Sequence, residues 1–474
     1  MEKIKAKLKL NYKRTCIIGF AFFGILLLWQ VFDSNCSLLL EDILKRKFNT
    51  PNADDVAYLV GLIMAMDNLA ALIMMPLFGM LSDKTKSPIG KRMPYILGGT
   101  LICAIFFPLI PFLFYLNNLA GMIVIMGIVV FFAMMYRNPA VALMPDITPK
   151  PLRSNANGII NVMGYLGGAI ATVLGIFLDV SKYLGVSNNP EANWQYQNFW
   201  VIEIPFLVAS VLIVVSTIVL FFLIKENKLQ EELRPELELG ESMSETEDKP
   251  VDNGPISKKN LIALLLILGA EFLWFMSDNS LVTFMANYTK NVLYSTTGQL
   301  SYAIIVGGAL SVVGFLTGGL IASKIGRKWT IVLGLVLTVV ALGVWYGCAA
   351  AMPLSKPATG ENALPFYIFI AWGIKGYGMA LVHTNSLPMV VELCTGKKVG
   401  RYTGFYYISS MLAQTITPTV LGLILLNKNI DYTFLPIYSL SFAIASLIVA
   451  LFIKNVRIKN MEIKKGLAAL DVDD

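Results

Sequence analysis

Apolar segments of twenty or more residues recur along nearly the whole of this 474-residue chain. The hydrocarbon core of a bilayer is about 30 Å thick, and a helix needs about 20 apolar residues to cross it. Only 15% of the residues are charged, against about 25% in soluble domains. The pattern predicts an all-α membrane protein with twelve transmembrane helices. We expect these spans at residues 15–40, 55–81, 94–116, 119–145, 154–180, 198–224, 260–288, 299–323, 329–351, 364–391, 400–426 and 432–454.

The positions of Lys and Arg predict the orientation of these spans. If both termini are cytoplasmic, 29 of the 38 basic residues fall in inner segments and 7 in outer loops. Basic residues are retained on the cytoplasmic side of a membrane. We therefore expect a multi-pass protein of the cell membrane with both termini in the cytoplasm. The net charge of +7 reports this topology, and we infer no nucleic-acid partner from it.

The cysteines and the histidine of this chain are too few and too far apart in the sequence to indicate a metal site or a hydrolytic site. The five cysteines stand singly, with no CxxC pair among them. The chain has a single histidine, His383. We therefore expect no enzyme activity, no metal site and no cofactor.

A polar, Glu-rich segment at residues 225–259 predicts a solvated cytoplasmic linker. It divides the chain into an N-terminal six-helix bundle, residues 1–224, and a C-terminal six-helix bundle, residues 260–474, which ends in a short cytoplasmic tail. The halves repeat one motif, since GMLSDKTKSPIGKR follows the second span and GGLIASKIGRK the eighth. Internal repeats of this kind are typical of secondary transporters and predict two pseudo-symmetric bundles.

A second repeat places an acid at the end of one helix and an Arg at the start of the next. It occurs after the fourth span and again after the tenth. Such an Arg can bridge to a carboxylate or to a helix C-terminus on a neighbouring helix. We predict that these groups lock an inner gate until the halves rock apart. The candidate gate residues are Asp83, Arg92, Asp146, Arg153, Glu392 and Arg401.

The turn DKTKSPIGKRMPYILGG resembles the inner-loop signature of the major facilitator superfamily, in its glycoside-pentoside-hexuronide cation symporter branch. Within it, GKRMPYI at 90–96 is similar to the Gly-Arg-Arg-Arg-Pro-Phe/Tyr-Ile of plant sucrose/proton symporters and of sucrose-type carriers of animals. NPAVALMPD at 138–146 is similar to their Gly-Pro-x-Arg-Ala-Leu-x-x-Asp. The resemblance covers the full chain in helix number and loop placement, and it implies a sugar symporter with the major facilitator fold.

Two departures from the family patterns concern the binding site. The plant pattern has a substrate-linked Arg where this chain has Val141, but Arg137 lies four residues earlier on nearly the same helix face. Melibiose-type carriers have acids just before the Pro of the second span, where this chain has Met75 and the nearest preceding acid of the span is Asp67. We therefore expect a proton as the coupling ion, with sodium as the alternative.

Charged side chains within the N-terminal spans are functional candidates because they are costly to bury. Asp67 lies about 18 Å into the second span. There it either binds the coupling ion or the substrate, or it forms a purely structural hydrogen bond with Asn68. Arg137 in the fourth span requires an acidic partner, and Asp67 or Glu271 could supply it. Asp33, toward the outer end of the first span, either lines an outer vestibule or faces the headgroups.

The seventh span carries Glu271, Trp274 and Asp278 at spacings that place all three on one stripe of a helix. Carboxylates accept hydrogen bonds from hydroxyl groups, and an indole face covers the apolar side of a pyranose. The stripe predicts a sugar-binding wall in which one acid could also hold the proton. The alternative is a packed helix with no binding role.

The tenth span carries Lys375, His383 and Asn385. Lys375 and His383 are eight residues apart and share a helix face. Because histidine titrates near neutral pH, His383 is a candidate proton switch, with a purely structural histidine as the alternative.

We predict a proton-coupled symporter that imports a sugar, a di- or oligosaccharide glycoside, by alternating access as a monomer in the lipid bilayer. The first alternative is a drug or metabolite antiporter that exports, which Arg137 and Lys375 disfavour because they would repel cationic drugs. The second is a sensor homologue without transport, which the short tail after the last span disfavours.

Overall fold

The computed structural model describes residues 9–50, 52–149, 152–184, 194–247, 258–358, 360–391, 399–427 and 429–453. Within these ranges the chain is helical, with no strand, and eleven helices are long and apolar enough to cross a membrane. The predicted tenth span forms helix α13 (Phe366–Val391) but is not among the eleven. Its polar side chains, above all Lys375 and His383, lower its hydropathy.

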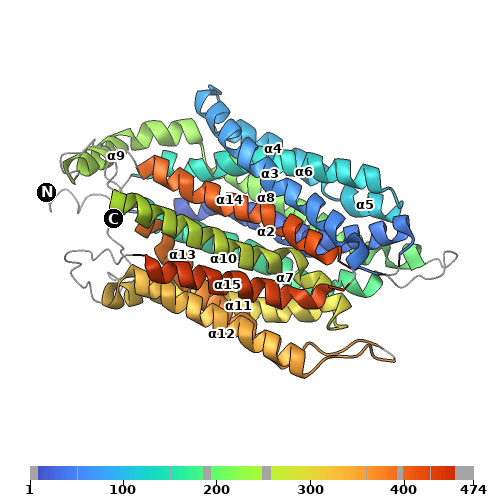
Figure 1. Cartoon of the computed structure of the whole chain (residues 1–474). Coiled ribbons are helices and arrows are strands. Elements are labelled where there is room, and N and C mark those ends of the chain that lie inside the picture. Colours follow the sequence, from blue (N-terminus) through green and yellow to red (C-terminus); the bar gives the residue numbers. More distant parts are fainter. Residues whose placement is uncertain are drawn as a thin grey trace. The chain divides into compact units, whose positions relative to one another are not determined.

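The helices follow the expected spans closely (Figure 1). Those of the first half are α2 (Tyr12–Phe48), α3 (Asp54–Lys84), α4 (Met93–Phe106), α5 (Leu109–Tyr115), α6 (Leu119–Asp146), α7 (Arg153–Phe177), α8 (Trp194–Leu223) and α9 (Glu226–Glu247), with a 3-10 turn η2 (Val180–Tyr183). Those of the second half are α10 (Lys258–Asn291), α11 (Thr297–Ile325), α12 (Arg327–Ala351), α13, α14 (Val399–Leu425) and α15 (Leu435–Phe452), with η4 (Tyr432–Phe434). The third span is divided between α4 and α5 because Pro108 has no N–H to continue the helix.

The helices pack into two compact units. Unit 1 comprises residues 1–43 and 69–249, and unit 2 comprises residues 44–68 and 250–474. Helix α3 therefore contributes its first half to unit 2 and its second half to unit 1.

In unit 1, α4 packs against α6 and α8. Aromatic side chains fill the α4–α8 contact, where the rings of Phe107 and Phe206 lie 4.8 Å apart. Helix α6 is capped by Asn118, whose side chain accepts a hydrogen bond from the Gly121 N–H at 2.9 Å. This is the usual way to satisfy a free amide of the first helical turn.

Helix α9 lies within the segment for which the sequence predicted a solvated linker. Leu229, Leu233 and Leu237 recur every four residues and form one face of this helix. Leu233 is buried. The remaining surface is acidic and carries an i, i+4 ion pair between Arg234 and Glu238. Because its leucines recur at helical spacing, part of this polar segment forms an amphipathic helix with a buried leucine.

In unit 2, α13 packs against both α11 and α12, and α10 packs against α14 and α15. Glycines let α13 approach its neighbours at backbone distance. A Cβ atom added to Gly376 would lie 2.3 Å from the carbonyl oxygen of Gly307 on α11, and one added to Gly378 would lie 2.6 Å from that of Gly334 on α12. The position of α13 is thus fixed by backbone contacts on two sides.

Candidate functional site

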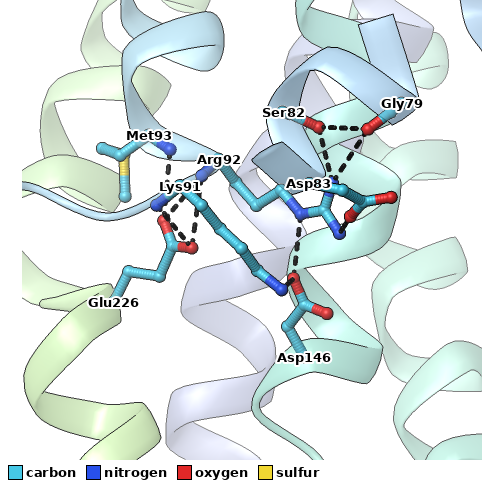
Figure 2. Close-up of polar contacts among 8 residues, drawn as sticks. All are labelled: Gly79, Ser82, Asp83, Lys91, Arg92, Met93, Asp146 and Glu226. Carbon is cyan, nitrogen blue, oxygen red and sulfur yellow. Dashed lines mark hydrogen bonds and ion pairs between the residues drawn. The ribbon is translucent and has the colours of Figure 1, made fainter. Parts of the chain in front are cut away.

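A cluster of charged residues ties together four helix ends of unit 1, at the end predicted to be cytoplasmic (Figure 2). We name it the cytoplasmic charge cluster, and its members are Asp83, Lys91, Arg92, Asp146 and Glu226. The Arg92 guanidinium donates to Asp146 through Nε at 2.8 Å and to Asp83 through Nη2. The Lys91 ammonium also pairs with Asp146, at 3.1 Å. These contacts join the ends of α3, α4 and α6.

Glu226, the first residue of α9, is fully buried in this cluster. Its carboxylate accepts hydrogen bonds from the backbone N–H groups of Lys91, Arg92 and Met93, at 3.0 to 3.2 Å. These amides open helix α4, which has no side-chain cap of its own. A carboxylate at a helix N-terminus satisfies its free donors and interacts favourably with its dipole.

The backbone before α4 is shaped to admit Glu226. Gly90 has φ of 118°, which favours glycine. A Cβ atom there would lie 2.0 Å from Oε2 of Glu226. Asn227 donates from Nδ2 to the carbonyl oxygens of Ser87 and Pro88, at 2.9 and 3.0 Å. The first two residues of α9 therefore hold the turn between α3 and α4.

Two pKa values in the cluster depart from their ordinary range. Burial raises the pKa of Glu226, and the hydrogen bonds from three backbone amides oppose that rise without cancelling it. Burial lowers the pKa of Arg92, but its hydrogen bonds and charge interactions with Asp146 and Asp83 outweigh burial, so the pKa lies above the ordinary value. Arg92 is therefore charged at any physiological pH.

The structure brings together Asp83, Arg92 and Asp146, three of the residues predicted to form the inner gate. Glu392 lies outside the described residues, as do the side chains of Arg153 and Arg401. A gating role for these groups stays a prediction.

In unit 2, an ion pair joins Asp278 of α10 to Lys375 of α13. The Lys375 ammonium also lies 5.7 Å from the ring centroid of Trp372, one turn earlier on α13, a cation–π distance. The ring of His383 lies 5.6 Å from that of Phe275, and the charges of both Asp278 and Lys375 act on His383. Side-chain exposures of 26% for Asp278 and 15% for Lys375 leave the pair partly exposed.

The predicted stripe on α10 runs from this partly exposed pair into the core. Trp274 is 2% exposed and belongs to the hydrophobic core of unit 2. Glu271 is completely buried. Asn385 of α13 is also buried and donates to the carbonyl oxygen of Leu381 at 2.9 Å. Of the candidates predicted in unit 2, the structure thus joins Asp278 and Lys375 in one ion pair, and it places His383 against Phe275.

The remaining candidates are less closely defined. Asp33, Asn68 and Arg137 each have an interaction partner, so none of them is unpaired. The side chain of Asp67 lies outside the described part of the chain. Whether Asp67 or Glu271 pairs with Arg137 stays a prediction.

Three residues of these sites, Trp372, Glu226 and Asn227, were not predicted from the sequence. Trp372 lies three residues before Lys375, a spacing that places it on the same helix face and could have marked it. Glu226 is the first acid after the sixth span, directly beyond the membrane end, but its partners are 133 to 135 residues away. Asn227 likewise bonds across 139 and 140 residues. Nothing local in the sequence indicates such contacts.

Membrane-length helices, an ion pair within the bundle of unit 2 and a charge cluster at the helix ends of unit 1 describe a multi-pass helical membrane protein. Residues 15–356 and 269–468 match the family model of the Major Facilitator Superfamily. The chain belongs to this superfamily, has its twelve-helix fold and is a membrane transporter rather than an enzyme. No significant match is found among curated proteins.

Solved structures of other transporters share the fold at low sequence identity. The inward-open xylose transporter XylE from E. coli is 13% identical, with a TM-score of 0.64 over 94% of this chain and 96% of that one. An auto-inhibited peptide transporter of the POT family is 11% identical, with a TM-score of 0.63 over 95% and 98%. A bacterial homologue of the human lysosomal transporter Spinster is 14% identical, with a TM-score of 0.60 over 94% and 97%.

Proposed function

We propose that this secondary transporter is a proton-coupled symporter that imports sugars, di- or oligosaccharide glycosides, by alternating access. The observation that carries the proposal is the Asp278–Lys375 ion pair beside Trp372. A carboxylate accepts hydrogen bonds from sugar hydroxyls, an ammonium donates to them, and an aromatic ring covers the C–H face of a pyranose. Because the two charges cancel, the pair favours a neutral polyol over a charged solute.

A proton is the coupling ion in this proposal, and the cell membrane is where the carrier acts. A proton that enters with a membrane potential of 100 mV supplies about 2.3 kcal/mol, enough for about fifty-fold accumulation of a neutral solute. Acids buried in the bundle can carry that proton without a metal or cofactor. We propose that the carrier acts as a monomer in the cell membrane with both termini cytoplasmic.

Uptake by proteoliposomes tests the substrate and the ion together. Purified protein is reconstituted and offered a panel of labelled mono- and disaccharides under an imposed pH gradient or sodium gradient. We expect uphill uptake of at least one sugar when the pH gradient is applied. Uphill uptake with sodium alone, insensitive to pH, contradicts proton coupling. If no sugar enters under any gradient, the sugar assignment is wrong.

Asp278→Asn tests the site itself. The substitution removes the negative charge of Asp278 and retains the shape of its side chain. We expect uptake of the transported sugar to fall about tenfold or more, because one charge-assisted hydrogen bond is lost. Glu238→Gln on the exposed face of α9 is the matched control and is expected to transport normally. Equal uptake by Asp278→Asn and the wild type would show that the ion pair is not part of the binding site.

A further inference from the structure

Glu271 is a buried acid for which the structure provides no hydrogen bond. Its side chain is 0% exposed, and neither carboxyl oxygen has a partner among the described residues. Two serine hydroxyls that contact α10 on either side of Glu271 donate to backbone oxygens instead: Ser409 of α14 to that of Leu268 and Ser446 of α15 to that of Ala270, both at 2.9 Å. An ionised carboxylate is too costly to bury without a partner. The observed site therefore fits an acid that carries its proton.

Two buried side chains of the core cluster around Ala270 can donate hydrogen bonds. The indole of Trp274, one turn further along the same face of α10, is buried and its Nε1–H has no acceptor among the described side chains and backbone. A buried indole N–H usually has one. Tyr406 of α14 is also buried, in the same core cluster as Ala270 and Trp274. Its hydroxyl contacts Ser386 Oγ at 2.7 Å, and the serine can act as the donor in that contact.

We propose that Glu271 carries the coupled proton, and that Trp274 and Tyr406 stabilise its carboxylate by donating hydrogen bonds when the proton leaves. In that step one O–H bond of Glu271 breaks and the proton passes to water. The carboxylate then accepts hydrogen bonds from the Trp274 indole and the Tyr406 hydroxyl, while Ser386 donates to Tyr406. The coupling role rests on the function proposed above, but the proton site itself does not.

The charged and titratable groups on the neighbouring helices do not form an ion pair with Glu271 in the described part of the chain. Helix α13 presents Lys375, which is paired with Asp278, and His383, whose ring lies 5.6 Å from that of Phe275, one turn from Glu271 on α10. Helix α14 presents Tyr406, and α15 presents serine hydroxyls. Helix α11 has its one charged side chain, Lys324, in its last turn. No basic side chain in the described part of unit 2 pairs with Glu271.

Tryptophan fluorescence tests the proton site without any substrate. Purified full-length protein in lipid nanodiscs is titrated from acidic to alkaline pH while its emission is recorded. We expect a pH transition in the wild type that is lost in both Glu271→Gln and Trp274→Phe. Trp345→Phe is the matched control, because Trp345 is equally buried in unit 2 but has no acid one turn away. A transition that persists unchanged in Glu271→Gln overturns the proposal.

Transport tests the coupling role. In proteoliposomes, with the sugar that the wild type takes up, we expect Glu271→Gln to retain counterflow exchange within about twofold. Its uphill accumulation falls from about fifty-fold at 100 mV to none, because the amide cannot release a proton. In Asp278→Asn both activities are expected to fall, by about tenfold or more. Uphill accumulation by Glu271→Gln at the wild-type level overturns this inference, whereas absence of sugar uptake by the wild type overturns only the proposed function.

Discussion

At the scale of single residues, Glu226 shows how one carboxylate can organise several chain segments. It is fully buried, caps α4 through three backbone amides and joins the cytoplasmic charge cluster from the start of α9. Because Gly90 leaves no room for a side chain beside it, the carboxylate and the turn fit each other. A buried acid of this kind makes the stability of unit 1 dependent on pH.

The sign of that dependence follows from the raised pKa of Glu226, which burial causes. The folded protein holds a proton at a pH at which the unfolded chain, with a pKa of about 4.3, has released it. The contribution of Glu226 to the free energy of unfolding is therefore full below the unfolded pKa and is lost as pH rises through the folded pKa. We expect the stability of the wild type minus that of Glu226→Gln to fall over this range.

Thermal unfolding of the detergent-solubilised proteins over a pH series measures this difference. Glu238→Gln, a change at an exposed acid on the same helix, controls for general charge effects and should give a difference that does not vary with pH. A stability difference between wild type and Glu226→Gln that grows with rising pH would contradict the expected sign.

At the scale of elements, the position of α13 decides whether Lys375 reaches Asp278. Helix α13 is held against α11 by Gly376 and against α12 by Gly378, both within three residues of this lysine. Close helix approach through small residues is a common basis of packing within membranes. The glycines therefore serve the ion pair as well as the packing of the bundle.

Gly376→Ala tests this link. The added Cβ would lie 2.3 Å from the Gly307 carbonyl oxygen, so the backbones must separate, at a cost of about 1–3 kcal/mol. We expect a lower unfolding temperature and reduced sugar uptake. Gly308→Ala adds a methyl group where no atom lies within 4 Å, and it should leave both quantities unchanged. Equal effects of the two substitutions would show that α13 tolerates the displacement.

At the scale of the whole molecule, the charge bias between inner and outer segments predicts one orientation in the membrane. Single-cysteine variants in a cysteine-free background measure it directly. With a membrane-impermeant maleimide, Lys356→Cys in the loop after α12 should be labelled in intact cells. Lys86→Cys in the turn between α3 and α4 should be labelled only after permeabilisation. The reverse pattern would place both termini outside.

Local sequence properties determined the spans, the class of protein and part of the cytoplasmic charge cluster. Helix positions could be predicted because the length and hydropathy of a segment alone decide whether it crosses a bilayer. Asp83, Arg92 and Asp146 could be predicted because they belong to a motif and a repeat that are visible in the chain. The polar character of α13 was also evident, since Lys375 and His383 interrupt an apolar segment.

Only the tertiary structure decided the partners. Arg92 meets Asp146 across 54 residues and Glu226 across 134, and Lys375 meets Asp278 on another helix. It also decided which acid of α10 is paired and which is buried without a partner, although the helical spacing places both on one face. Hydropathy sums over a segment and says which residues enter the membrane. Which helix faces meet there depends on packing between segments far apart in the chain.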